Sequence, residues 1–355
     1  MSSILTNAGA ISALHTLRSI NSDMVRVQDQ FATGLRVNRA SDNAAYWSIA
    51  TTMRSDNKAL SAVGDSIAIG QAILDTAYQG MDGVRTHLEA LKNNLITARD
   101  LPLSTSTGAP LSFSDFMRAF EGSTLAKIDA EIDQHAAATW TIAKSSSFNG
   151  VNLLVNSYDD TETSYSHLDF VVGYANGAVQ TARIDRADTT LYNANLQNFP
   201  AGALGTMGLL DAAITYPGHY YSLPPLKYHL YPGIGQTEPL GPSTSLLATI
   251  EFNVQNDPAL RASRYDEAIS SLDGTIERLV DRMATIGAFT SSLKAYDAFN
   301  QKRSDALEKG VGQLVDADMN ETSTRLKALQ AQEQLGIQAL QIANTTPQAI
   351  LQLFR

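Results

Sequence analysis

Residues 60–95 read LSAVGDSIAIGQAILDTAYQGMDGVRTHLEALKNNL. Apolar residues recur through this stretch at alternating steps of three and four, the heptad pattern of a coiled-coil helix, and Gly70 is the one position without a side chain. A helix of that length spans roughly 50 Å at about 1.5 Å per residue and needs partner helices. One long helix of a globular bundle would show the same pattern. The seam positions are Leu60, Val63, Ile67, Gly70, Leu74, Ala77, Met81, Val84, Leu88, Leu91 and Leu95.

A second heptad seam lies at the start of the chain. Its members again alternate steps of three and four, and they are Leu17, Ile20, Met24, Val27 and Phe31. We expect this helix to begin almost at residue 1 and to end at Gly34. Chain ends are normally expendable. A strong seam placed there therefore indicates a partner in another molecule or at the other terminus.

Helical patterning returns after Pro258 and continues to the C-terminus. One seam there is formed by Tyr265, Ile269, Leu272, Ile276, Leu279, Met283 and Ile286. A last segment covers Asp316 to Arg355, with apolar positions at Leu326, Leu329, Leu335, Ile342, Leu353 and Phe354. We expect its first acidic residues to cap the helix, and Thr346-Pro347 to break and restart it.

The segments between the seams predict further helices. Ser41 or Asp42 has the residue type of an N-cap for the helix that leads into the first seam. Residues 100–114 are rich in Pro, Gly, Ser and Thr and predict a loop. After it, Ser114-Asp115 is expected to cap one helix that carries Leu125, Ile128 and Ile132.

The centre of the chain changes to the period of β structure. Val151 to Val155 is typical of a short strand, and residues 168–184 alternate on both sides of Asn176-Gly177, a strong hairpin signal. Ala248 to Val254 alternates apolar and polar residues and predicts a half-buried strand. Residues 158–260 are therefore expected to form an inserted, loop-rich β domain.

This insertion has an unusual composition. Eight of the eleven prolines lie from Pro200 to Pro258, and nine of the thirteen tyrosines lie from Tyr158 to Tyr231. Aromatic rings stack on sugars and bury well in interfaces, so the Tyr-rich run is a candidate binding patch. Ordinary packing of the insertion is the favoured interpretation.

Composition argues against several classes of function. The formal net charge is −10, from 26 basic and 36 acidic residues without a basic cluster, which disfavours nucleic-acid binding. The absence of cysteine excludes disulfides and thiol chemistry. No apolar run reaches the length that spans a membrane. The N-terminus has no positively charged region before an apolar run, so we expect no cleavable secretory signal.

Catalytic and metal-binding motifs do not stand out either. Asp316-Ala317-Asp318-Met319-Asn320 begins like a calcium loop, but Glu321 stands where the loop requires glycine and Lys327 where it requires a glutamate. We predict no enzyme, no metal and no cofactor. Structural or surface roles are favoured for the histidines, which have no metal-ligand spacing and lie at positions 15, 87, 135, 167, 219 and 229.

Segments at both ends of the chain carry a family resemblance. They are Phe31-Ala32-Thr33-Gly34-Leu35-Arg36-Val37-Asn38, Ser41-Asp42-Asn43-Ala44-Ala45, Ile128-Asp129-Ala130-Glu131-Ile132, Phe148-Asn149-Gly150, and Ala343-Asn344 through Pro347-Gln348 to Leu353-Phe354-Arg355. With them the chain resembles bacterial flagellin, the filament subunit of the flagellum, over roughly residues 1–156 and 262–355. Trp47 and the segment 316–320 resemble the flagellins of α-proteobacteria.

The resemblance implies a mainly α fold, in which N- and C-terminal segments form a long coiled-coil helical rod with an inserted β-rich outer domain. Residues 1–43 and 317–355 would form the inner coiled coil. Residues 44–157 and 261–316 would form the surrounding rod with a small hairpin, and residues 158–260 the variable outer domain. The seams would then be subunit interfaces, including the long seam at Leu74, Leu88 and Leu91.

The function implied by the resemblance is mechanical. The chain would be a secreted structural subunit that self-assembles into the extracellular filament used for swimming motility. Implied partners are further copies of the chain, other flagellins, the flagellar export apparatus and its chaperone, and the hook-associated and cap proteins, with no nucleic acid and no membrane. Two alternatives stay open. One is a surface-displayed flagellin homologue that binds glycans or host surfaces through the Tyr-rich insertion, and the other is a hook–filament junction protein.

One further expectation concerns recognition by vertebrate cells. Many flagellins carry an Arg-x-Arg-Glu-Leu stretch, where the innate flagellin receptor binds. The matching positions in this chain are Ala90, Leu91, Lys92, Asn93 and Asn94. Only Lys92 keeps a charge, and it lacks the planar fork of arginine. The resemblance therefore implies weak binding to that receptor.

Overall fold

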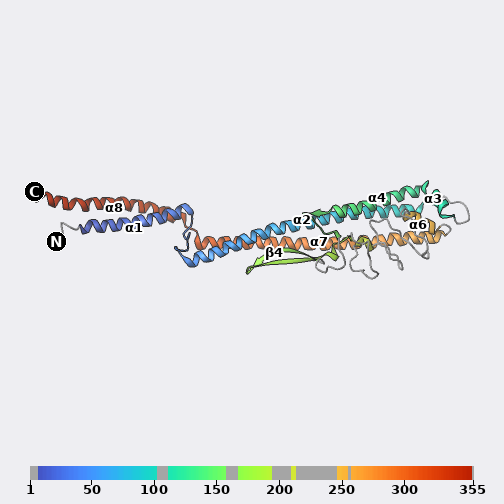
Figure 1. Ribbon diagram of the computed structural model, residues 1–355, viewed down its shortest axis with the longest axis horizontal. Coiled ribbons are helices and arrows are strands. Elements are labelled where there is room, and N and C mark those ends of the chain that lie inside the picture. The colour runs from blue at the N-terminus through green and yellow to red at the C-terminus, as the bar shows by residue number, and fades with distance from the viewer. Residues whose placement is uncertain are drawn as a thin grey trace. The chain divides into compact units, whose positions relative to one another are not determined.

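The computed structural model describes residues 7–101, 111–156, 167–193, 209–212, 246–254 and 257–353. Within these ranges the chain is mainly helical, with long helices toward both ends and short strands in the middle of the sequence (Figure 1). The predicted fold class is confirmed. The chain divides into two compact units, one formed by Met1–Ala62 with Asn300–Arg355 and the other by Val63–Phe299.

In the first unit, the two ends of the chain pair as antiparallel helices. α1 (Ala8–Thr33) and α8 (Met319–Leu353) lie side by side (Figure 1). Asn7 is the N-cap of α1, and its Nδ2 donates to the carbonyl oxygen of Ala343 near the far end of α8, at 2.8 Å. The seam at the start of the chain thus has a partner at the other terminus.

A short connection follows α1. Gly34 ends the helix, as predicted, in the left-handed region (φ 71°) that glycine adopts without strain. The N–H of Val37 then donates to the carbonyl oxygen of Val315 at 3.2 Å. Both valines are buried with Ala50 and Val311 in a small core.

The next helix, α2 (Ala44–Asp100), begins later than its predicted cap. Asn43 caps it, since its Oδ1 accepts from a first-turn N–H at 3.1 Å. The prediction of Ser41 or Asp42 is wrong because the Asp42 carboxylate accepts from two N–H groups of the preceding turn, at 2.9 and 3.0 Å.

In the second unit, the long seam of α2 is the centre of the hydrophobic cores. Every seam position from Val63 to Leu95 is buried, Gly70 included. α7 (Pro258–Val315) fills the same cores. The predicted heptad register of α2 is confirmed. Of the predicted α7 seam, the buried members are Tyr265, Leu279, Met283 and Ile286. The others are half-buried and pack against the cores, and they are Ile269, Leu272 and Ile276.

Two helices stand where one was predicted after the 100–114 segment. α3 (Phe113–Glu121) is capped by Ser112 and α4 (Thr124–Ser145) by Ser123, whose hydroxyl oxygens accept from backbone N–H groups at 3.3 and 3.2 Å. The prediction of Ser114-Asp115 as a single cap is wrong because each helix has a serine of its own immediately before it.

Short strands form three two-stranded sheets within the described residues. The hairpin predicted at Asn176-Gly177 is confirmed, with both residues in the left-handed region (φ 52° and 79°). The strand predicted from Val151 to Val155 is instead two strands with different partners. The pairs are β1 (Ser147–Phe148) with β2 (Val151–Asn152), β4 (His167–Ala175) with β5 (Ala178–Asp185), both antiparallel, and β3 (Val155–Asn156) with β6 (Tyr192–Asn193), parallel. A 3-10 turn (Arg186–Asp188) and the short α5 (Leu209–Ala212) lie among them.

The β4–β5 hairpin packs on the long seam and explains its glycine. Phe170, Val172 and Ile184 are buried in the core that α2 and α7 share. A Cβ placed on Gly70 would lie 2.7 Å from Phe170 Cδ1, closer than real side chains approach. Gly70 therefore leaves room for the hairpin.

A helix replaces the strand predicted from Ala248 to Val254. α6 (Leu246–Asn253) starts at Asp129 of α4, whose Oδ1 accepts from the N–H of Leu247 at 3.0 Å. Leu247 and Ile250 are both buried, so more than one face of this segment packs against the core. The prediction is wrong because an apolar run fits both periods, and contacts with α3 and α4 select the helix.

The last helix is continuous where a break was predicted. α8 runs through Pro347 to Leu353 without the expected break. A proline removes one intrahelical hydrogen bond, and here only about two turns of helix follow it. The acidic start is as predicted, because Asp318 Oδ1 accepts from the N–H groups of Asn320 and Glu321 at 2.8 and 3.2 Å.

Candidate assembly surface

The seam residues that the sequence assigns to subunit contacts separate into two groups. Leu74, Leu88 and Leu91 of α2 are buried inside the second unit, where the chain's own helices and strands cover them. They hold the subunit together and are not free to contact a neighbour. Their assignment as interface residues is corrected by this burial.

The seam of α1 is only partly covered. Val27 is buried, and Leu17, Ile20 and Met24 are half-buried. A Cβ on Gly336 of α8 would lie 2.9 Å from Leu17 Cδ1, so the two helices approach closely there. Phe31 is 44% exposed, the highest value among the five seam residues.

The seam of α8 is covered even less. Leu329 is buried and Leu326 is half-buried, whereas Leu335 and Ile342 are 63% and 67% exposed. The side chains of Leu353 and Phe354 lie outside the residues that can be described. One face of α8 therefore packs on α1 and another lies bare.

The exposed apolar side chains of the α1–α8 pair are candidates for contact with other copies of the chain. We call this set the terminal apolar surface, although its members lie on more than one face of the pair. The members are Ile11, Leu14, Val25 and Phe31 of α1 with Leu335, Ile337 and Ile342 of α8.

The positions that the sequence matches to the receptor stretch lie on α2 in the second unit. Lys92 Nζ forms an ion pair with Asp273 Oδ1 of α7 at 2.7 Å. Asn94 donates to Glu131 of α4 at 3.4 Å. Ala90 is half-buried and Asn93 is exposed. The one charged member is thus already paired within the chain.

Sequence reasoning missed a buried polar cluster that joins α6, α7 and the end of α2. Glu251 is buried, and it accepts from Arg261 at 2.6 Å and from the Tyr265 hydroxyl at 2.7 Å. The Arg261 guanidinium also donates to the carbonyl oxygens of Ala98, Arg99 and Leu101, at 3.0, 2.6 and 2.7 Å. A cation at these carbonyls caps the C-terminus of α2. The sequence feature that could have indicated this cluster is Glu251, a single glutamate within an apolar run.

The chemistry of this cluster is structural. Burial, together with the neighbouring Glu251 carboxylate, raises the pKa of Tyr265 far above its ordinary value, so the hydroxyl stays a donor. Arg261 neutralises the carboxylate and completes its hydrogen bonds. Both charged groups thus have hydrogen-bond partners, which offset the cost of removing the ion pair from water.

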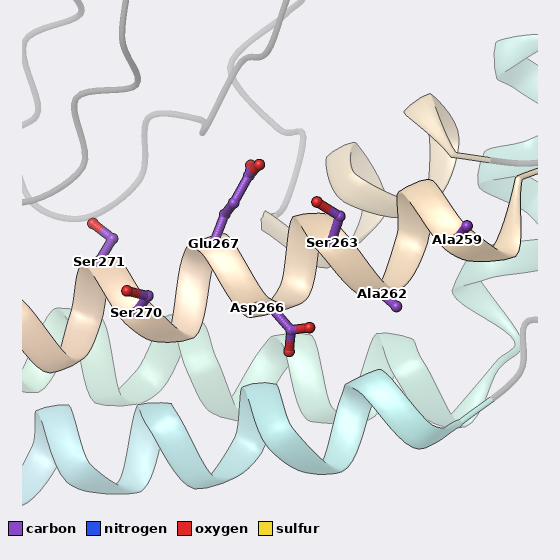
Figure 2. Close-up of a pocket in the computed structure, with 7 residues that line it drawn as sticks. All are labelled: Ala259, Ala262, Ser263, Asp266, Glu267, Ser270 and Ser271. Carbon is purple, nitrogen blue, oxygen red and sulfur yellow. The ribbon is translucent and has the colours of Figure 1, made fainter.

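A shallow groove runs along the first turns of α7 (Figure 2). Its lining is mostly alanine and serine, with Asp266 and Glu267. Asp266 pairs with Arg99 at 3.0 Å, and Glu267 pairs with Arg264 at 3.1 Å. Both carboxylates serve as ion-pair partners on the helix surface.

Among the residues that the structure describes, no helix combines the length and hydropathy needed to cross a membrane. The same residues contain no group of three or more acidic, histidine or cysteine side chains placed to hold a metal. Most of the Tyr- and Pro-rich run, residues 213–245, lies outside the described ranges.

Comparison with known proteins agrees with the helical organisation. Two family models match: the bacterial flagellin N-terminal helical region over residues 4–159, and the bacterial flagellin C-terminal helical region over residues 269–354. The chain is 36% identical to Flagellin C of Rhizobium meliloti over 372 residues. It is 34% identical to Flagellin A of that organism over 414 residues and 32% identical to the flagellin of Brucella melitensis over 355 residues. Each alignment covers 100% of both chains. The chain thus belongs to the bacterial flagellins, of the α-proteobacterial type, and is a structural subunit of the extracellular flagellar filament.

Proposed function

We propose that copies of this chain join through the terminal apolar surface and that this contact holds the filament together. The observation that carries the proposal is the exposure of Leu335 and Ile342 on a helix whose other face is already packed. Burying such side chains contributes roughly 1.5–3 kcal/mol each. A patch that fits a different patch on the next copy makes a heterologous contact, and such contacts build an open helical filament when the rotation does not close.

In the predicted division of the chain, this contact belongs to the inner coiled coil. Residues 1–43 and 317–355 form the inner coiled coil in our proposal, 44–157 and 261–316 the surrounding helical rod, and 158–260 the outer domain. The pairing of α1 with α8 supports the first part. The buried seams of α2 and α7 support the second, because they make a self-contained helical core.

The role that we propose is mechanical and not enzymatic. The charged groups in the cluster around Arg261 and in the α7 groove are all engaged in ion pairs. Partners in the proposal are other flagellins of the same filament, the flagellar export apparatus with its chaperone, and the hook-associated and cap proteins. Nucleic acid and membrane have no part in it.

Seeded polymerisation of purified variants tests the contact. Leu335→Asp and Ile342→Asp each place a charge on the terminal apolar surface, so we expect both to stay monomeric. Because the two side chains are exposed in the subunit, monomer stability should change by no more than about 0.5 kcal/mol. Gln334→Asp adds the same charge beside Leu335 and should still polymerise. Polymerisation of all three variants at the wild-type rate contradicts the proposal.

We also propose that the monomer is a poor agonist of the vertebrate flagellin receptor. Losing an arginine-type anchor commonly costs about 2 kcal/mol or more, so several losses lower affinity by orders of magnitude. The pairing of Lys92 with Asp273 adds to this, because the lysine must break an ion pair to bind elsewhere. A reporter-cell assay decides it. The variant Ala90→Arg, Asn93→Glu, Asn94→Leu should gain potency, and equal potency of the unmodified chain and a flagellin with the full stretch contradicts it.

A further inference from the structure

The fold brings together two histidines that are far apart in the sequence. His87 lies on α2 and His135 on α4, both within the second unit. Their Nδ1 atoms are 2.9 Å apart, and the ring centroids are 5.2 Å apart with the planes tilted by 46°. Both side chains are half-buried. This is hydrogen-bond distance between two groups that each carry at most one proton on the facing nitrogen.

The state of this bond depends on the protons that the pair holds. When both rings are neutral, one Nδ1–H donates to the bare Nδ1 of the other ring. A first added proton leaves the bond in place, since the charged ring still donates to a neutral one. A second proton puts an N–H on both facing nitrogens and a positive charge on both rings. The bond is then lost and replaced by repulsion between like charges.

Three helices carry charged groups near the pair. On α2, Arg85 two positions before His87 forms ion pairs with Asp82 and Glu89. On α4, Glu131 lies one turn before His135 and accepts from Asn94, and Asp133 lies two positions away from the histidine. On α7, Asp273 pairs with Lys92.

We propose that His87 and His135 form an acid-sensitive clasp that fastens α4 to α2 at neutral pH and releases it when both rings are protonated. The inference goes beyond filament formation, because it concerns how firmly one helix of the subunit is held. It makes the second unit less stable in acid than its apolar core alone would require.

The pH window follows from the titration of His87. Burial, followed by the nearby His135, lowers the pKa of His87 below its ordinary value of 6.5. The folded state therefore prefers the neutral ring. The contribution to stability is full above pH 6.5 and is lost as the pH falls below 6.5 and through the lower folded-state pKa.

Nitrogen NMR of the full-length monomer, labelled at histidine, tests the clasp directly. Above pH 6.5 we expect one protonated and one bare Nδ1 in the pair, and a titration of His87 that lies below its ordinary midpoint. A His87 ring that titrates at its ordinary midpoint, with no interaction between the two Nδ1 atoms, overturns the proposal.

Thermal unfolding of variants provides the second test. In His135→Gln the amide can still donate to His87 Nδ1 but carries no charge at any pH. Between pH 7.5 and 5.5 the melting temperature of the wild type should fall about 2–4 °C further than that of this variant. His87→Gln should behave in the same way. His15→Gln, which removes an exposed histidine from α1, should match the wild type. Parallel pH dependence of all four proteins contradicts the clasp.

Discussion

Gly70→Ala tests whether packing of the β4–β5 hairpin is the reason that the long seam has a glycine at this position. The new Cβ would lie 2.7 Å from Phe170 Cδ1, 3.3 Å from Phe170 Cε1 and 3.5 Å from Leu293 Cδ1. The first distance is too short for two carbon atoms, so the ring or the hairpin must shift. Gly287→Ala on α7 is the matched control, because a Cβ there meets no heavy atom within 4 Å.

Two opposing terms set the expected magnitude. Replacing glycine by alanine inside a helix stabilises by about 1 kcal/mol. Overpacking a filled core costs about 1–3 kcal/mol. Gly70→Ala should therefore change the free energy of unfolding by between about 0 and 2 kcal/mol in the destabilising direction. Gly287→Ala keeps only the gain, so the two variants should differ by about 1–3 kcal/mol.

Urea unfolding of the monomer, followed by circular dichroism, measures this difference. The same pair of substitutions is then made in a Phe170→Ala background, where the obstructing ring is absent. Gly70→Ala should stabilise that background as much as Gly287→Ala does, which isolates the coupling between the two residues. Equal stabilisation by both alanines in the wild-type background would falsify the claim that Phe170 requires the glycine.

Three further predictions concern the second unit and the connection after α1. Leu88→Asp places an unpaired charge in the core and should cost several kcal/mol in urea unfolding and abolish filaments, whereas Glu89→Ala on the outer face should be tolerated. Arg261→Met leaves the buried carboxylate of Glu251 without its cation and should cost about 3–5 kcal/mol, seen as a lower melting temperature. Backbone N–H groups hold the pKa of Asp42 below its ordinary 3.8. Its contribution to the stability of the fold is therefore full above pH 3.8 and is lost as the pH falls through the folded-state pKa. Asp42→Asn should flatten that part of the acid-stability profile.

The long helices could be predicted because their signal repeats over many turns. Eleven consecutive seam positions in α2 agree on one register, and all are buried. The hairpin could also be predicted, since Asn176 and Gly177 are residue types that adopt positive φ readily. In both cases the deciding information lies within one continuous segment.

Features that depend on distant residues could not be predicted. The segment 246–253 is a helix partly because Asp129, more than a hundred positions earlier, caps its first turn. The contact between His87 and His135 likewise results from the packing of α4 on α2. Neither partner is visible in the local pattern.

The candidate surface shows the same limit. A heptad seam must pack against other helices, but its sequence does not show whether those helices belong to the same chain or to a neighbouring one. Leu74 and Leu88 are covered by the subunit itself, whereas Leu335 and Ile342 are not. Only the packed structure separates the seam that holds one subunit together from the seam that remains for its neighbours.

Electron microscopy of the purified wild-type chain after seeding tests the central claim most directly. A filament subunit with the terminal apolar surface exposed should add copies without limit and give long helical filaments. If only a few copies add to each seed, as expected of a junction protein, the account is contradicted. It is equally contradicted by a monomer that never polymerises although α1 and α8 are folded.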